Sequence, residues 1–252
     1  MGIDHFSKCT LKLAVMAGGE TPIAWGTGLL ISCLGRFFIV TNWHNVSGRH
    51  PKTRVLKGLI PQSLRIYHRV RDRMTGLLEI KPVDEPLLSP QEKPLWVDHD
   101  NRDLSDQEDE NLAIDVAILP LTKLNAVATD VAYLWQSRVV EPFVDVGSPI
   151  SIVGYPLRRS GVKNYPIWKS AHIASDIHAH PDQKHFLVDS VTREGMSGSP
   201  VIVRQQLGQL LGIYSGRLEN DPEFGIGIVW RSSLIHDLVC KCIGPEAAKQ
   251  LK

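Results

Sequence analysis

The sequence has few cysteines, and they are poorly placed for disulfide bonds. Only four occur in 252 residues, at Cys9, Cys33, Cys240 and Cys242. Small extracellular scaffolds without a large core usually carry many more. Cys240 and Cys242 are also too close in sequence for a comfortable bridge. We therefore expect reduced, packed thiols rather than a disulfide framework.

The chain also lacks long apolar runs and an excess of charge of either sign. No apolar stretch reaches the roughly 18 residues of a membrane-spanning helix. The net charge of +1 gives no sign of a polyanionic partner such as nucleic acid. The segment Met1–Phe6 lacks the basic-then-apolar pattern of a signal peptide. The expected location is therefore cytoplasmic, with no membrane partner.

The chain does contain many short apolar segments rich in β-branched residues. Apolar residues make up 43% of the chain, enough for one large or two small cores. Short strands separated by frequent turns, without a long helical period, favour an antiparallel β-barrel. A serine start and helical apolar spacing predict a helix from about residue 232, and residues 83–111 read as an acidic surface loop. The expected strands lie at 10–16, 27–32, 36–41, 55–60, 63–70, 77–82, around Asp115, and at 149–154, 167–173, 186–190, 200–204, 209–215 and 225–230.

The segment Arg193–Pro200 combines a serine with two flanking glycines. Gly195 and Gly198 allow backbone angles closed to other residues, so the chain can fold closely around Ser197. Such a turn can aim the N–H groups of Gly195 and Ser197 at one point beside the serine hydroxyl. A nucleophile next to two converging donors suits acyl transfer. The alternative is a glycine-rich hairpin with an ordinary serine.

A histidine and an aspartate occur in matching contexts upstream. His44 follows the apolar run 37–41, and Asp115 interrupts the apolar run 114–120. A carboxylate at such a position is costly to bury without a partner. An imidazole N–H is such a partner, and the pair leaves the other ring nitrogen free to accept the proton of Ser197.

These segments, in the order His44, Asp115, Ser197, resemble the catalytic motifs of trypsin/chymotrypsin-like serine peptidases. Gly26–Ile31 and Val153–Pro156 add to the likeness. The closer likeness is to the bacterial branch with glutamyl endopeptidases and HtrA-type peptidases. The resemblance implies two packed antiparallel six-stranded β-barrels with a C-terminal α-helix. The first would span 8–122 and carry His44 and Asp115, and the second 123–252 with Ser197.

The resemblance further implies a serine endopeptidase that acts on proteins or peptides without cofactor or metal. His44, Asp115 and Ser197 would form the triad, and the N–H groups of Gly195 and Ser197 the oxyanion hole. Trypsin-type zymogens carry an aspartate just before the nucleophile, where this chain has Met196. We therefore expect activity without N-terminal cleavage; the sequence identifies no activating partner. A catalytically idle domain that binds peptides is the alternative.

The specificity pocket is also inferred from the resemblance. Val191 occupies the place of the acidic residue of trypsins, which argues against a strong Lys or Arg preference. Tyr214 stands where glutamyl endopeptidases carry a histidine, so the residue preferred before the cut bond stays open. We expect Ser215 to hydrogen-bond near Asp115. The two walls would comprise Val191, Thr192 and Arg193, and Tyr214, Ser215, Gly216 and Arg217.

Two other clusters bring to mind metal ligands. Asp176, His178 and His180 alternate, but Pro181 and Asp182 next to them favour a solvated loop. Cys240, Cys242 and His236 provide too few ligands for a typical zinc site. We therefore predict no metal at either cluster.

Overall fold

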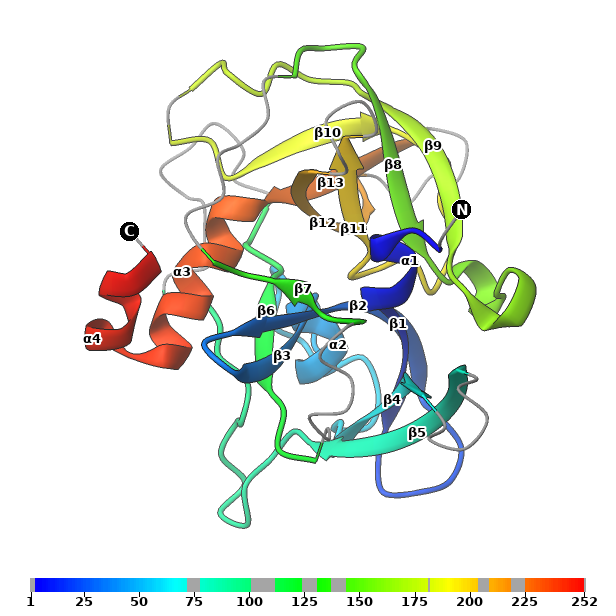
Figure 1. The fold of residues 1–252 in the computed structure, drawn as a ribbon, viewed down its shortest axis with the longest axis vertical. Coiled ribbons are helices and arrows are strands. Elements are labelled where there is room, and N and C mark those ends of the chain that lie inside the picture. The colour runs from blue at the N-terminus through cyan, green and yellow to red at the C-terminus, as the bar shows by residue number, and fades with distance from the viewer. Residues whose placement is uncertain are drawn as a thin grey trace.

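The protein consists of two β-sheets packed against each other, with helices at the C-terminal end of the chain (Figure 1). The computed structural model describes residues 3–71, 78–100, 112–123, 131–136, 144–180, 182–203, 209–218 and 225–251.

The first sheet has seven strands. Its hydrogen-bonded order is β5-β4-β1-β2-β3-β6, and β7 pairs with β2 in parallel. Helix α1 precedes β1, and the one-turn helix α2 follows β3. The bounds are α1 His5–Cys9, β1 Thr10–Met16, β2 Ala24–Cys33, β3 Arg36–Thr41, α2 Trp43–Ser47, β4 Ser63–Arg71, β5 Leu78–Pro86, β6 Ala117–Pro120 and β7 Tyr133–Leu134.

The second sheet closes on itself as a six-stranded barrel in the order β10-β13-β12-β11-β8-β9. Two short 3-10 turns follow β8, and three helical segments end the chain. The bounds are β8 Pro149–Gly154, η2 Pro156–Arg158, η3 Val162–Asn164, β9 Ile167–Ile173, β10 His185–Asp189, β11 Pro200–Val203, β12 Gln209–Arg217, β13 Ile226–Arg231, α3 Ser232–Ile243, α4 Pro245–Ala248 and η4 Lys249–Leu251. The expected all-β fold of two packed barrels with a C-terminal helix is confirmed. The first sheet, called the first barrel below, differs from the expected six antiparallel strands because β7 adds a seventh, parallel strand to it.

Two apolar cores hold these elements together. One fills the second barrel and includes Ile152, Val188 and Val201. The other joins the inner face of the first sheet to α3 and continues into second-barrel residues such as Ile202 and Ile213. Because this core is continuous across both sheets, side chains from the two barrels can meet at fixed positions between them.

Two expectations about strands are wrong, and the expected surface loop at 83–111 starts later, because β5 continues to Pro86. Residues 55–60 form no strand, and their only ladder contact is the bridge between Arg49 and Leu56. Their apolar side chains do not enter the core, since Val55 is 64% and Leu59 is 63% exposed. Asp115 does not lie within a strand but two residues before β6.

Some expectations stay untested by the fold. The acidic stretch 101–111 lies outside the described residues. A domain boundary at 122/123 stays a prediction, although β7 beyond it pairs with β2 of the first sheet. Among the described helices, none has the length and apolar character needed to cross a membrane.

Candidate active site

Strand pairing brings His44 and Asp115 together. Strands β3 and β6 are antiparallel neighbours, with Thr41 opposite Ala117. His44 follows β3 on helix α2, and Asp115 precedes β6. Because these strands are antiparallel, both residues lie beyond the same end of the strand pair. Gly48 ends α2 in the left-handed conformation, with φ 68°, and its N–H donates to the His44 carbonyl oxygen at 3.0 Å. The backbone around both residues is therefore fixed by regular structure.

The Asp115 carboxylate holds His44 at two points. Its Oδ1 accepts from the His44 backbone N–H at 2.9 Å, and its Oδ2 lies 2.6 Å from His44 Nδ1. The Asp115 side chain is only 2% exposed, while that of His44 is 24% exposed. With Nδ1 donating to the carboxylate, Nε2 is the acceptor nitrogen of the neutral ring.

Ser215 connects this pair to Ser197. Its hydroxyl donates to Asp115 Oδ2 at 2.6 Å, which confirms the expected contact. Its backbone carbonyl oxygen accepts from the Ser197 hydroxyl at 3.0 Å. In the described part of the chain, no hydrogen bond joins Ser197 to His44 directly. The structure thus brings all three predicted triad residues into one hydrogen-bonded network through Ser215.

The backbone of the Ser197 turn uses its glycines as the sequence indicates. Gly195 and Gly198 have φ of 91° and 89°, in the region closed to most other residues. They also allow close approach, since a Cβ on Gly198 would lie 2.0 Å from the Thr27 carbonyl oxygen. Among the described residues, no acceptor takes a hydrogen bond from the backbone N–H of Gly195 or Ser197.

The pocket residues predicted from the sequence lie beside this turn. The Gly198 N–H donates to the Tyr214 carbonyl oxygen at 2.9 Å, which fixes β12 against it. The Tyr214 phenol is buried, and its hydroxyl is hydrogen-bonded to Thr192 Oγ1. A Cβ on Gly227 would lie 2.4 Å from Tyr214 Cε2, so the ring rests directly on that glycine. Val191 is 43% exposed, Arg193 and Arg217 are exposed, and Gly216 is partly buried.

Of the two candidate metal clusters, the one with Asp176 lies in a surface loop and the one with Cys240 lies on helix α3. Asp176 and His178 form a turn in which Asp176 Oδ1 accepts from the His178 N–H at 2.8 Å. Cys240 and Cys242 lie on α3 and form no disulfide, and Cys240 Sγ lies 3.5 Å from His236 Nε2. Burial raises the pKa of the Cys242 thiol to about 11. In the described ranges, no three His, Cys, Asp or Glu side chains gather closely enough to hold a metal ion.

Comparison with known families places this geometry. A family model described as trypsin-like peptidase domain matches residues 26–213, most of the chain. The chain belongs to the trypsin-like peptidase family. This match includes His44, Asp115, Ser197 and the start of β12, and it makes proteins or peptides the substrates of the family domain.

Solved structures agree on the fold of this peptidase domain. The active form of the Rv3671c protease from M. tuberculosis is 20% identical, with a TM-score of 0.57 over 94% of this chain and 81% of that one. A Glu endopeptidase is 16% identical, with a TM-score of 0.52 over 92% and 89%. An HtrA-type protease solved with a tripeptide is 14% identical, with a TM-score of 0.56 over 94% of this chain and 60% of that one. A search of curated proteins finds no match.

Sequence reasoning assigned no role to three residues that shape the peptidase site. Asn42 Nδ2 donates to the Asp115 carbonyl oxygen at 2.7 Å. Thr27 and Leu157 both hydrogen-bond the backbone of the Ser197 turn from outside it. The position of Thr27 between two glycines was the only hint of its role in the sequence. Its contact with the Ser197 turn depends on how the barrels dock.

Proposed function

We propose that the protein is a serine endopeptidase that acts through a His44–Asp115–Ser197 triad and a covalent acyl-enzyme. The observation that carries this proposal is the grip of Asp115 on His44, joined to Ser197 through Ser215. A buried carboxylate with this partner is the arrangement that orients a general base.

In the first step, Ser197 Oγ forms a bond to the scissile carbonyl carbon, and its proton passes to His44 Nε2. The hydroxyl must first leave the Ser215 carbonyl oxygen, to which it donates at rest. Asp115 keeps the proton on Nδ1 and stabilises the imidazolium that forms. The carbonyl oxygen becomes an oxyanion beside the N–H groups of Gly195 and Ser197. Loss of one such donor typically reduces turnover by about 10²–10³.

In the second step, the C–N bond breaks and His44 gives its proton to the leaving amine. Water then enters, loses a proton to His44 and attacks the acyl-enzyme ester. The second tetrahedral intermediate collapses, releases the new carboxylate and returns the proton to Ser197. Apart from the substrate and this water molecule, the steps use only these side chains and the backbone donors.

The proposal is tested with a peptide mixture whose cleavage products are identified by mass spectrometry. We expect wild-type protein to cleave internal peptide bonds. Ser197→Ala and His44→Ala should cleave them at least about 10³-fold more slowly. His50→Ala is the matched control, because His50 is an exposed histidine near α2 and its loss should leave the rate unchanged. Wild-type protein that binds the peptides as tightly as Ser197→Ala and cleaves none would instead be a peptide-binding module.

A further inference from the structure

Thr27 of the first barrel grips the Ser197 turn of the second. Its side chain is fully buried, and its Oγ1 donates to the Gly195 carbonyl oxygen at 2.7 Å. Its backbone N–H donates to the Ser197 carbonyl oxygen at 2.8 Å. Thr27 therefore contacts the same two residues whose N–H groups are proposed to hold the oxyanion.

A second contact fixes the direction of the Gly195 N–H. The Leu157 N–H donates to the Glu194 carbonyl oxygen at 2.7 Å. That carbonyl and the Gly195 N–H belong to one peptide unit, and in a trans peptide they point in opposite directions. Holding the carbonyl towards Leu157 therefore turns the N–H away from it.

The turn itself has two possible forms. The Met196 N–H donates to the Arg193 carbonyl oxygen at 3.2 Å, and Gly195 at the third position has φ 91°. A positive φ at this position defines a type II turn, whereas a type I turn has the central peptide rotated by about half a turn. In the type I form, the Glu194 carbonyl oxygen would lose Leu157, and the Gly195 N–H would lose its present direction.

The Thr27 hydroxyl connects the Ser197 turn to the loop that carries Leu157. While it donates to Gly195, it accepts from the Tyr155 N–H at 3.2 Å, two residues before Leu157. One hydroxyl thus serves a donor on the loop after β8 and an acceptor on the Ser197 turn. Valine has the same shape but can serve neither group, so both would be left buried and unpaired.

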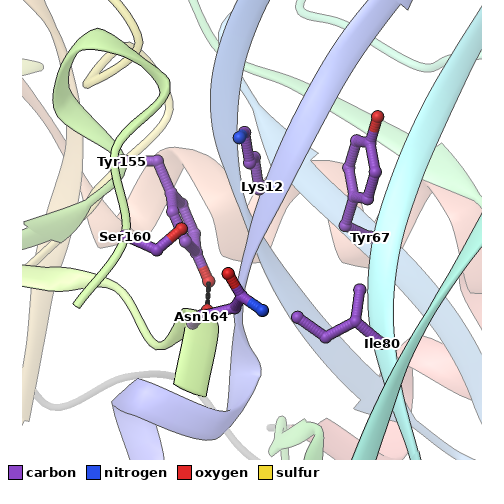
Figure 2. Close-up of a pocket in the computed structure, with 6 residues that line it drawn as sticks. All are labelled: Lys12, Tyr67, Ile80, Tyr155, Ser160 and Asn164. Atoms are coloured by element: carbon purple, nitrogen blue, oxygen red, sulfur yellow. Dashed lines mark hydrogen bonds between the residues drawn. The ribbon is translucent and has the colours of Figure 1, made fainter. Parts of the chain in front are cut away.

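The loop that carries Leu157 is also anchored to the first barrel. Leu157 and Arg158 have φ of 50° and 63°, conformations that need support from their surroundings. Lys12 Nζ donates to the Arg158 carbonyl oxygen at 2.8 Å, and Arg69 donates to the Asn164 carbonyl oxygen at 2.9 Å. A cavity of about 250 Å³ lies beside these anchors and is lined by side chains from the loop and from the first sheet. Figure 2 shows them: Tyr155, Ser160, Asn164, Lys12, Tyr67 and Ile80.

The residue before the nucleophile takes no part in holding the turn by charge. Met196 is fully buried and has no carboxylate, so it cannot form an ion pair there. We propose that the Thr27 hydroxyl is the positioning group that keeps the oxyanion hole in its type II form. The first barrel then sets the hole of the second, without a cleaved N-terminus. This inference rests on the proposed serine endopeptidase function.

Thr27→Val and Thr27→Ser test the role of the hydroxyl. We expect Thr27→Val to lower kcat by about 10² with KM changed less than threefold, because the hole acts on the transition state. Thr27→Ser keeps the hydroxyl and should stay within threefold of wild type. If Thr27→Val does not fold, Thr27→Ala takes its place, with the same expected fall in kcat.

Thr10→Val is the matched control. Thr10 is a fully buried threonine on β1, next to β2, and its hydroxyl has no hydrogen-bond partner among the described residues. Removing that hydroxyl should therefore leave kcat unchanged. A general disturbance of the first barrel would lower kcat in both variants.

A second readout separates positioning from simple loss of structure. A peptide aldehyde forms a hemiacetal with Ser197 whose oxygen enters the hole, whereas the matching peptide alcohol has no carbonyl group and forms no such adduct. Thr27→Val should weaken aldehyde binding by about 10² and leave binding of the alcohol unchanged, with folding checked by circular dichroism. Equal loss for both ligands, or wild-type kcat in Thr27→Val, would overturn the inference while wild type remains active. Wild-type protein without any hydrolysis would refute the endopeptidase function and this inference with it.

Discussion

Asp115 binds His44 through both carboxylate oxygens, one to the backbone N–H at 2.9 Å and the other to Nδ1 at 2.6 Å. The first contact fixes where helix α2 starts relative to β6, and the second fixes the plane of the ring. Because the carboxylate is almost fully buried, the direction of Nε2 is set by the fold rather than by solvent.

Asp115→Asn tests this relationship. An amide of the same shape can present an N–H to Nδ1, which favours the tautomer with the proton on Nε2. We expect kcat to fall by about 10⁴ with the fold retained, measured on a peptide substrate alongside the thermal unfolding midpoint. A loss of less than tenfold would show that the carboxylate does not control the tautomer.

Tyr214 should limit the size of the substrate residue before the cut bond. Its ring rests on Gly227 and its hydroxyl bonds Thr192, so the phenol fills the inner end of the proposed pocket. We expect wild type to prefer small residues such as alanine at this position. In Tyr214→Ala, kcat/KM for phenylalanine relative to alanine should rise by about 10–100-fold.

Tyr214→Phe is the control for that experiment, because it keeps the ring and loses only the hydroxyl. Its preference should stay with small residues. The reading of the pocket is wrong if wild type already cleaves after phenylalanine faster than after alanine.

Two arginines on the same face of β4 should differ greatly in their effect on stability. The Arg69 guanidinium is buried and donates to the carbonyl oxygens of Lys8 and Asn164 and to the Tyr155 hydroxyl. Arg69→Met leaves these acceptors unpaired and should lower the free energy of unfolding by about 2–4 kcal/mol.

Arg65 provides the comparison. It pairs with Asp84, but the side chains are 28% and 41% exposed, so solvent screens the pair. Arg65→Gln should therefore lower the free energy of unfolding far less than Arg69→Met does. Urea titrations measure both variants, and equal losses would contradict the assignment of Arg69 as a structural anchor.

Stability should fall in mild acid because of buried histidines. Burial lowers the pKa of His68 in the folded protein, with the nearby charge of Lys81 acting in the same direction. The unfolded chain takes up this proton near pH ~6.5, while the folded protein does so only at lower pH. The contribution of His68 to the free energy of unfolding is therefore constant above that pH and decreases below it.

His68→Gln should reduce this decrease between about pH 6.5 and 5. Part of it should remain, since burial also lowers the pKa of His99. Urea unfolding at a series of pH values measures the slope. An identical slope in the variant would mean that His68 does not contribute.

The sequence was sufficient for the fold class, because the segments around His44, Asp115 and Ser197 each lie in a recognisable local pattern. The resemblance to trypsin-like peptidases also predicted the contact of Ser215 with Asp115 that the structure contains. The strand predicted at 55–60 is absent because apolar composition alone does not show whether a segment packs against a core. Thr27 and Leu157 were missed because their contacts join segments more than 30 residues apart in sequence. The Thr27 contact also depends on how the two barrels dock, which no local pattern encodes.

The most direct test of the proposed triad is labelling with a fluorophosphonate, followed by mass spectrometry of the modified peptide. This probe reacts with a serine only when a base and an oxyanion hole activate it. We expect a single adduct on Ser197 in wild-type protein and none in Ser197→Ala or His44→Ala. Folded wild-type protein that stays unlabelled, or that is labelled equally in His44→Ala, would contradict it.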